Sequence, residues 1–215
     1  MCFACTLAGC VPTLHVDVSA INDGGPKLIG SYAIEAGSDQ VSDRDLVFRE
    51  VASLVEIAMD ERGYTRVSPD DEPDLYLLVD FAISDGQLDI DTIPAPARFR
   101  TGVTFGRGGP YGRYGTFGYD TFYDERIVVR EVFDSFLWLD AIEARSWEGF
   151  IAGTDEPEPL WQLSAVATSQ TRDLRRLMPF LVFAARDYIS EDTGRARRVT
   201  VSADEYGFEL YSNEY

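Results

Sequence analysis

The sequence has few of the residues that most often carry chemistry. Its 215 residues include one histidine, His15, and three cysteines, all within the first ten positions. The remainder of the chain therefore has neither an internal disulfide nor a thiol nucleophile. No G-x-S-x-G, H-E-x-x-H or Walker sequence occurs, so no serine hydrolase, zinc protease or phosphate-binding loop is indicated. The sequence predicts no catalytic residues, no metal ligands and no cofactor.

Long apolar runs and positive charges are also scarce. No run approaches the roughly 20 apolar residues that a membrane-spanning helix needs. The 37 acidic residues outnumber the 19 basic ones, which gives a net charge of −18. Such a surface repels nucleic acid and anionic lipid, so neither is expected as a partner. With 45% apolar and 13% aromatic residues, the chain is nevertheless expected to form one globular domain.

The segment Leu7-Ala8-Gly9-Cys10 resembles the lipobox of bacterial lipoproteins, in which a peptidase cuts before the cysteine that carries the lipid. Small side chains before the cut are typical of signal peptides. Only nine residues precede Cys10, and none is Lys or Arg, whereas a secretory signal needs a charged start and about 7–15 apolar residues. We interpret residues 1–10 as a truncated signal whose true start lies upstream. The resemblance implies lipidation at Cys10.

A zinc site is the alternative interpretation of the same segment. Its four candidate ligands are Cys2, Cys5, Cys10 and His15. Their C-x2-C-x4-C-x4-H spacing resembles a zinc knuckle, since zinc takes four nitrogen or sulfur ligands in a tetrahedron. The residues between them are apolar, whereas knuckles usually carry basic and aromatic groups there. Zinc content measured by elemental analysis separates the two interpretations.

Two stretches have the apolar spacing of amphipathic helices. Residues 43–62 are expected to begin at Ser42 as N-cap, with Asp45 three residues later as in a capping box. Residues 172–189 contain Pro179, which removes a backbone donor and predicts a kink or a restart.

Strands are predicted where apolar and polar residues alternate. These stretches are residues 27–35, 74–84, 126–140, 146–152, 160–169 and, less regularly, 195–202. Together they predict a single α+β domain over residues 27–203, with two helices packed on one face of a mostly antiparallel sheet. The expected order is β-α-β-(Gly/aromatic loop)-β-β-β-α-(β). Residues 11–26 are expected to form a tether, and residues 204–215 an acidic tail.

Residues 98–123 differ in composition from the rest. Four arginines and no acid fall between Asp91 and Asp120, and seven glycines alternate with seven aromatics over residues 102–123. The glycine spacing is not that of a dinucleotide site, and one Arg-Gly-Gly copy in so acidic a chain does not favour nucleic acid. We expect an inserted flexible loop. Its candidate binding residues are Arg107, Tyr111, Arg113, Tyr114, Phe117 and Tyr119.

Four short motifs within residues 28–189 resemble those of a known protein family. They are Arg62-Gly63-Tyr64, Pro73-Asp74-Leu75, Leu139-Asp140-Ala141 and Trp147-Glu148-Gly149. In this order they resemble the bacterial lipoprotein family known as domain of unknown function 4136. The resemblance implies an envelope lipoprotein with an α+β fold and no assigned activity.

Two classes of function are consistent with these features. The first is a non-catalytic envelope lipoprotein, which binds a partner protein or ligand through a sheet edge or the aromatic loop. In bacterial lipoproteins an Asp directly after the lipidated cysteine resembles a signal for retention in the inner membrane. Here that position is Val11, so the protein is expected in the outer membrane, facing the periplasm. The second is a carboxylate-based hydrolase or carbohydrate-active enzyme, since 37 acids place some pairs together. Trp138, Trp147 and Trp161 are predicted to lie on strands in the core rather than to form ligand platforms. The sequence does not indicate the oligomeric state.

Overall fold

The computed structural model describes residues 13–23, 30–38, 41–42, 44–94, 98–104, 116–122, 125–151 and 158–202. Contacts divide the chain into two units. The first combines Met1–Asp85 with Phe133–Tyr215, and the second is Gly86–Val132. Each unit is considered by itself below. Among the described helices, none has the length and apolar character needed to cross a membrane.

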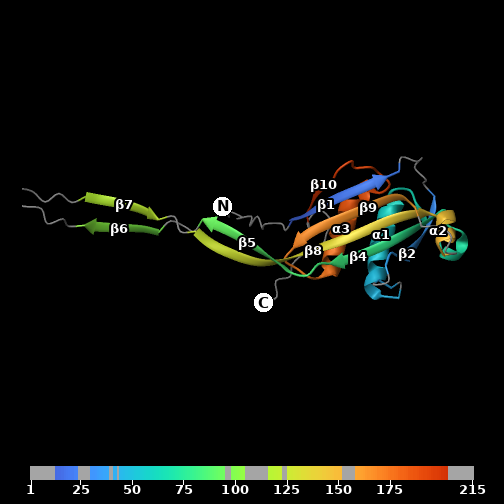
Figure 1. Cartoon of the computed structure of the whole chain (residues 1–215), viewed down its shortest axis with the longest axis horizontal. Helices are drawn as coiled ribbons and strands as arrows, with labels where there is room; N and C mark the ends of the chain where they lie inside the picture. Colours follow the sequence, from blue (N-terminus) through green and yellow to red (C-terminus); the bar gives the residue numbers. More distant parts are fainter. Residues whose placement is uncertain are drawn as a thin grey trace, which may run out of the picture. The chain divides into compact units, whose positions relative to one another are not determined.

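The first unit is built on a mostly antiparallel sheet. Its strand order is β10-β1-β9-β8-β4-β2-β3 (Figure 1). The strands are β1(Thr13–Asn22), β2(Ser31–Ala36), β3(Thr65–Arg66), β4(Leu75–Ile83), β8(Glu125–Glu143), β9(Pro159–Ser169) and β10(Arg197–Ser202). Among the described strands, only the pairs of β2 with β3 and with β4 are parallel. Residues 133–143 of β8 belong to this unit.

One face of this sheet is buried beneath two helices. Alternate residues of each central strand point to that face, as the pleat requires; on β4 these are Leu75, Leu77 and Val79, all essentially inaccessible. The helices α1(Leu46–Glu61) and α3(Leu174–Ala185) bring their own buried apolar residues to the same core. A third helix, α2(Ala144–Ile151), and two 3-10 turns, η1(Pro69–Asp71) and η2(Arg186–Tyr188), complete the elements. The expected α+β class is confirmed.

The boundaries of the two large helices differ from expectation. The N-cap of α1 is Asp45, whose side chain accepts a hydrogen bond from the Val47 N–H at 3.0 Å. Ser42 instead accepts one from the Arg44 N–H, within the preceding turn. The helix α3 continues through Pro179 to Ala185, so the helix does not restart there.

Two expected segments take another conformation. Residues 11–26 were expected as a tether, yet Thr13–Asn22 forms β1, which pairs with both β9 and β10. Its alternating Val16, Val18 and Ala20 are buried in the core, and this burial holds the strand in the sheet. Residues 146–152 were expected as a strand and lie largely in α2. The apolar positions of so short a stretch fit either period.

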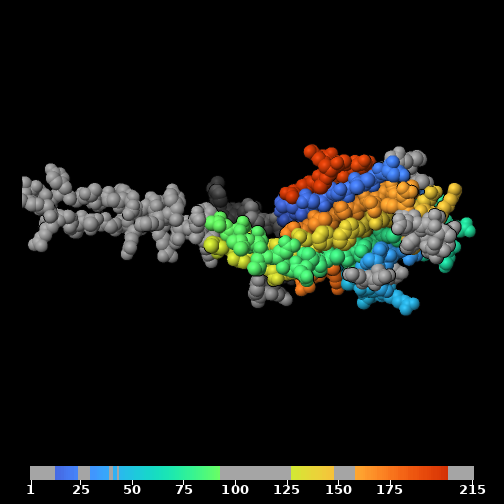
Figure 2. Space-filling view, in the orientation of Figure 1, coloured from blue at the N-terminus to red at the C-terminus, as the bar shows by residue number. Residues whose placement is uncertain are grey.

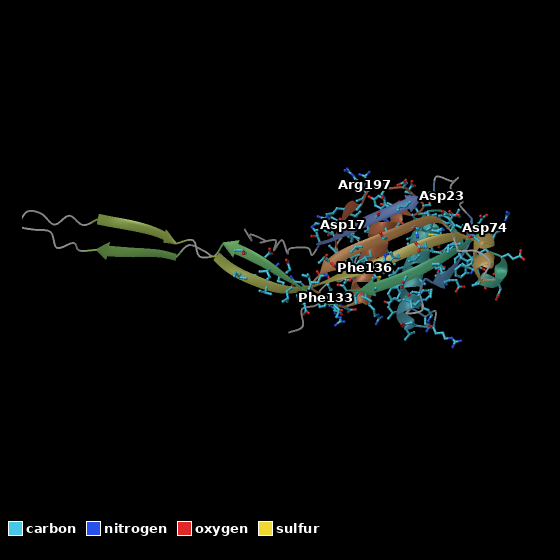
Figure 3. All side chains as sticks on the ribbon, in the orientation of Figure 1. Asp17, Asp23, Asp74, Phe133, Phe136 and Arg197 are labelled. Atoms are coloured by element: carbon cyan, nitrogen blue, oxygen red, sulfur yellow. The ribbon has the colours of Figure 1, made fainter. Side chains whose placement is uncertain are left out.

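The start of the parallel pair β2–β4 is tied by one carboxylate. Asp74, which precedes β4 (Figure 3), accepts hydrogen bonds from the backbone N–H and the hydroxyl of Ser31, both at 2.8 Å. These bonds favour the ionised form and lower the pKa of Asp74. A Cβ at Gly30 would lie 2.5 Å from the same carboxylate, so a larger residue there would have to displace the Asp74 side chain from Ser31. The Pro73-Asp74-Leu75 motif thus has a structural role.

The second unit consists of two ribbons. In the first, β5(Gln87–Pro94) pairs antiparallel with residues 125–132 of β8. In the second, β6(Arg98–Thr104) pairs with β7(Thr116–Phe122). The inserted loop expected over residues 98–123 therefore contains two strands. Residues 204–215, expected as an acidic tail, lie outside the described residues.

Beyond the end of β10, a buried threonine hydroxyl forms hydrogen bonds with the backbone of β1. The ladder between them ends at Val18, and Ala20 lies beyond it. Thr193 takes the place of a strand there. Its Oγ1 accepts from the Ala20 N–H at 3.0 Å and donates to the Ala20 carbonyl at 3.1 Å.

We expect Thr193→Val to lower the free energy of unfolding by about 1–3 kcal/mol, because the buried Ala20 N–H loses its acceptor. Urea denaturation followed by circular dichroism measures the change. Thr193→Ser keeps the hydroxyl and should lose much less. Equal losses in the two variants would show that the hydroxyl is not the cause.

Candidate functional site

Most of the residues expected to be functional lie outside the described part of the chain. These are Cys10, Arg107, Tyr111, Arg113 and Tyr114. Phe117 and Tyr119 lie on β7, but their side chains are not among those described. The lipidation site and the aromatic loop therefore remain predictions.

The zinc interpretation also rests mainly on undescribed residues. Of its four candidate ligands only His15 is described; it lies on β1, with its Nδ1 at 3.1 Å from the hydroxyl of Thr200 on β10. Within the described residues, no group of three or more His, Cys, Asp and Glu side chains is placed to hold a metal ion.

The sheet face opposite α1 and α3, here called the outer face, carries the candidate site. Figure 2 shows β1, β9, β8 and β4 side by side across this surface. Of the described elements only α2 packs on it, through Trp147, whose ring lies 5.4 Å from that of Tyr76. Strand register sets which outer-face residues meet. One row is Ser19, Ser164, Trp138 and Asp80, and the next is Ile21, Gln162, Asp140 and Leu78.

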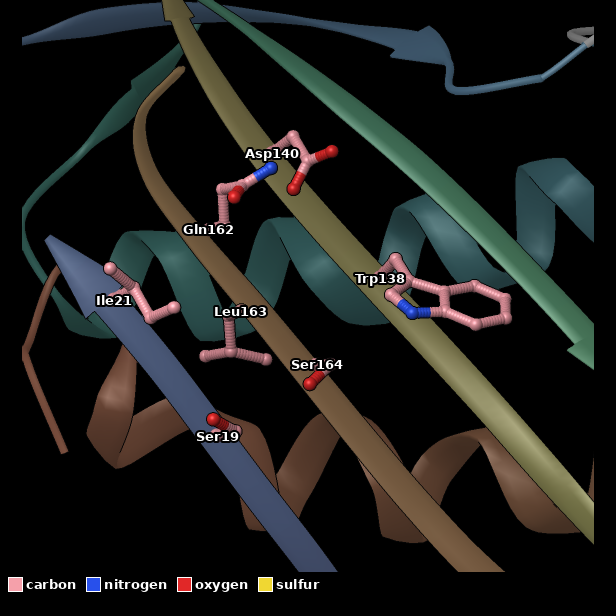
Figure 4. A pocket seen from close by; sticks show the side chains of 7 residues that line it. All are labelled: Ser19, Ile21, Trp138, Asp140, Gln162, Leu163 and Ser164. Carbon is pink, nitrogen blue, oxygen red and sulfur yellow. The ribbon is translucent and has the colours of Figure 1, made fainter. Parts of the chain in front are cut away.

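Small residues between large ones make a hollow in this face. Facing side chains on neighbouring strands lie about 4.5–5.5 Å apart, so the paired serines Ser19 and Ser164 leave space between Ile21 and Trp138. We call this space, of about 230 Å³, the outer-face hollow (Figure 4). Its lining residues are Ser19, Ile21, Trp138, Asp140, Gln162, Leu163 and Ser164.

An aromatic strip forms one side of the hollow. The rings of Trp138 and Phe136, on alternate positions of β8, are parallel within 1° with centroids 5.1 Å apart. In Figure 4 the indole extends from β8 toward β4 across the outer face. The tryptophans were all expected on strands in the core. That is confirmed for Trp161, 4% exposed on β9, but wrong for Trp138, which is only partly buried, and for Trp147, which lies on α2.

Asp140 is the one charged residue that lines the hollow. Partial burial raises the pKa of Asp140 above its ordinary value. A hydrogen bond with the Gln162 side chain opposes this rise, and the nearby Asp80 carboxylate adds to it. Figure 4 shows the side chains of Asp140 and Gln162 turned toward one another.

The next row of the outer face carries a different electrostatic arrangement. Asp17, on the same register row as Val166 and Phe136 (Figure 3), makes two hydrogen bonds with the guanidinium of Arg198, at 2.9 and 2.8 Å. These bonds lower the pKa of Asp17. Asp17 is therefore paired on the surface, whereas Asp140 has a carboxamide as its partner.

The second unit contains an exposed apolar surface, here called the apolar ribbon face. It consists of Leu88, Ile90, Ile127 and Val129, each more than half exposed. In the β5–β8 ladder Ile90 is opposite Val129, so the two share a face, while the adjacent pair Asp89 and Arg130 lies on the other.

Charge is distributed unequally between the two units. Within Gly86–Val132 there are six acids and six arginines, which gives no net charge. The whole excess of −18 therefore falls on the remainder of the chain. The second unit is the part of the protein that can approach an acidic surface without repulsion.

Comparisons with known proteins show no family membership. No protein-family model matches the sequence, and no curated protein does. Among solved structures, a PDZ domain protein from Parabacteroides distasonis is similar at a TM-score of 0.42 and 13% identity, over 89% of this chain and 40% of that one. The chain thus spans about two fifths of that protein's length. The PelC dodecamer from Paraburkholderia phytofirmans is similar at a TM-score of 0.37 and 12% identity, over 81% and 95%.

The raised pKa of Asp140 predicts how stability depends on pH. The folded state holds this proton more tightly than the unfolded state, so ionisation of Asp140 destabilises the fold. The penalty is present at neutral pH and disappears as the pH falls through the raised pKa to below the ordinary value of 3.8. We expect Asp140→Asn to unfold at higher urea than the unchanged protein at pH 7, with the gap closing at pH 3.5. The exposed turn variant Asp70→Asn is the control. A gap that is absent at pH 7 would contradict the assignment.

Proposed function

We propose that this protein is a lipid-anchored, non-catalytic component of the bacterial envelope that contacts another envelope protein through its second unit. It would be acylated at Cys10, face the periplasm from the outer membrane, and resemble the domain of unknown function 4136 lipoproteins. One observation carries the proposal: Gly86–Val132 combines zero net charge with four large exposed apolar side chains on one ribbon face.

The start of β1 supports a close attachment to the membrane. Thr13 is three residues after Cys10. An extended chain covers at most about 3.6 Å per residue, so their Cα atoms lie within about 11 Å. An acyl group on Cys10 would therefore hold the sheet beside the lipid surface. Anchoring would depend on acyl chains, at about 0.8 kcal/mol for each buried methylene, because the acidic body is not attracted to anionic lipid.

The ribbon of β5 and β8 supports a protein partner. A two-stranded ribbon is marginally stable alone and gains stability when its apolar face is covered. Within the described residues, the apolar ribbon face is left exposed. An apolar patch of this kind on a soluble surface marks an interaction site. The neutral charge of the unit removes the repulsion that the acidic body would add at such a contact.

A carbohydrate-active hydrolase is the second candidate, and one observation favours it. Asp80 and Asp140 lie diagonally on neighbouring strands of the outer face, and Asp80 contributes to the raised pKa of Asp140. Acid–base catalysis of glycoside hydrolysis uses a pair of carboxyl groups that flank the bond to be cleaved. Release of new reducing ends from the β-1,4-linked hexamers of glucose or N-acetylglucosamine would support this candidate over the non-catalytic one.

We expect Cys10→Ser to move the protein from the membrane pellet to the soluble fraction when it is expressed from its natural gene. The loss follows because the acyl chains supply the attachment. Mass spectrometry of the N-terminal peptide should show a lipid adduct on Cys10 in the unchanged protein. Cys5→Ser, which leaves the lipidated residue intact, should stay in the membrane. A free Cys10 thiol in the native protein would reject the anchor.

Photo-crosslinking tests the partner contact with neighbouring residues as matched controls. A benzophenone side chain at Ile90 or Val129 should join the protein to one envelope protein, because these residues lie on the apolar ribbon face. The same group at Asp89 or Arg130, on the opposite face, should give much less adduct. Immunoblots and mass spectrometry of the adducts measure the difference. Equal yields from the two faces would contradict the proposal.

A further inference from the structure

The outer-face hollow combines features that a solvated sheet face does not need. Trp138 places a large, partly buried ring on the outer face, and the exposed part of its area costs free energy in contact with water. Two strands away, on β1, Ile21 is 62% exposed. On β9, between the strands of these two residues, the outer face carries Ser164 and Gln162, and Ser164 is paired with the equally small Ser19. The protein thus keeps an apolar platform beside an open space, an arrangement that suits a ligand better than packing.

We propose that the outer-face hollow binds one ring of a neutral glycan, which stacks on Trp138 while Asp140 and Gln162 bind its hydroxyl groups. A sugar ring has a face of C–H groups and a rim of hydroxyls. The broad indole matches the first and the polar pair matches the second.

The polar groups around the hollow are suited to hydroxyls. The Gln162 carboxamide has two polar atoms. One is hydrogen-bonded to Asp140, and the other is available to a ligand. The Asp140 carboxylate has further lone pairs that accept from sugar hydroxyls. The hydroxyls of Ser19 and Ser164 can donate or accept at the floor of the space. All four groups come from neighbouring positions on three strands, so the sheet fixes their spacing.

Charge selects a neutral ligand. The lining includes no Lys, Arg or His, and its one ionisable group is the Asp140 carboxylate, with Asp80 close by. An anionic sugar or phosphate would meet two carboxylates and an acidic body. A cationic ligand would find one charged group in the lining, the Asp140 carboxylate, beside three polar groups without charge. A hydroxyl-rich, uncharged ligand uses every polar group in the hollow.

Size limits the contact to a single ring. Pockets that enclose a whole small molecule usually measure about 300–1,000 Å³. The hollow has about 230 Å³ and lies on an open face. One ring of a longer chain therefore occupies it, while the rest of the chain passes over the sheet. Phe136, two positions before Trp138 on β8, stacks on one face of the indole and holds its plane in place.

Titration calorimetry with the purified full-length protein tests the proposal. The probes are the β-1,4-linked hexamers of glucose and of N-acetylglucosamine, and trilysine is the cationic comparison. We expect at least one hexamer to bind saturably. Trp138→Ala should weaken it by about 10-fold or more, the amount that a well-formed aromatic contact contributes. Trp138→Phe should recover part of the affinity.

A second variant keeps the test independent of the loss of the ring. Ser164→Leu fills the hollow while leaving Trp138 in place, so it should abolish hexamer binding. Val166→Ala, on the same strand and face but outside the lining, should bind like the unchanged protein. Circular dichroism and thermal unfolding confirm that each variant is folded.

Three results would overturn the assignment: no saturable binding of either hexamer, unchanged affinity in both Trp138→Ala and Ser164→Leu, or binding of trilysine alone. Because the measurement needs neither a membrane nor a partner protein, a failure of the lipid anchor or of the ribbon contact leaves it unaffected.

Discussion

The whole arrangement depends on the burial of one face of a single sheet. Alternate residues of β1, β9, β8 and β4 pack beneath α1 and α3, and this apolar contact is the core of the first unit. A sheet with helices on one side must leave its other side to solvent or to a ligand. The same pleat that sends Val18, Leu139 and Leu163 inward sends Ser19, Asp140 and Gln162 outward. Core and candidate site are therefore two faces of the same strands.

The elements that the sequence predicts well are those whose pattern is local. The stripes of α1 and α3 and the alternation of β4 need no distant partner to be recognised, because they repeat within one segment. β1 has equally clear alternation in Val16, Val18 and Ala20. It was missed because its position after the lipobox favoured a tether. Its place between β9 and β10 depends on residues at least 139 positions away.

The outer-face hollow could not be predicted from the sequence for the same physical reason. Ser19, Ser164 and Trp138 are unremarkable one by one, and only the order β1-β9-β8 sets them in a row. Strand order and register follow from packing of the entire domain, which no local pattern encodes. Asp140 lies in the Leu139-Asp140-Ala141 motif, but nothing in the sequence connects that motif with Gln162. The apolar ribbon face was missed likewise, since alternation in β5 alone does not show that the face stays uncovered.

The distribution of charge affects the two proposed contacts, the glycan in the outer-face hollow and the protein partner at the second unit, in different ways. A body with an excess of 18 negative charges discourages crowding of its own copies and of anionic polymers on the outer face. An uncharged glycan experiences little of this field, because it has no net charge to repel. A protein partner does experience it, and the neutral Gly86–Val132 unit is where that repulsion is weakest. In both proposals the acidity selects the ligand: it does not repel an uncharged sugar ring from Trp138, and it disfavours protein contacts outside the unit where acids and arginines balance.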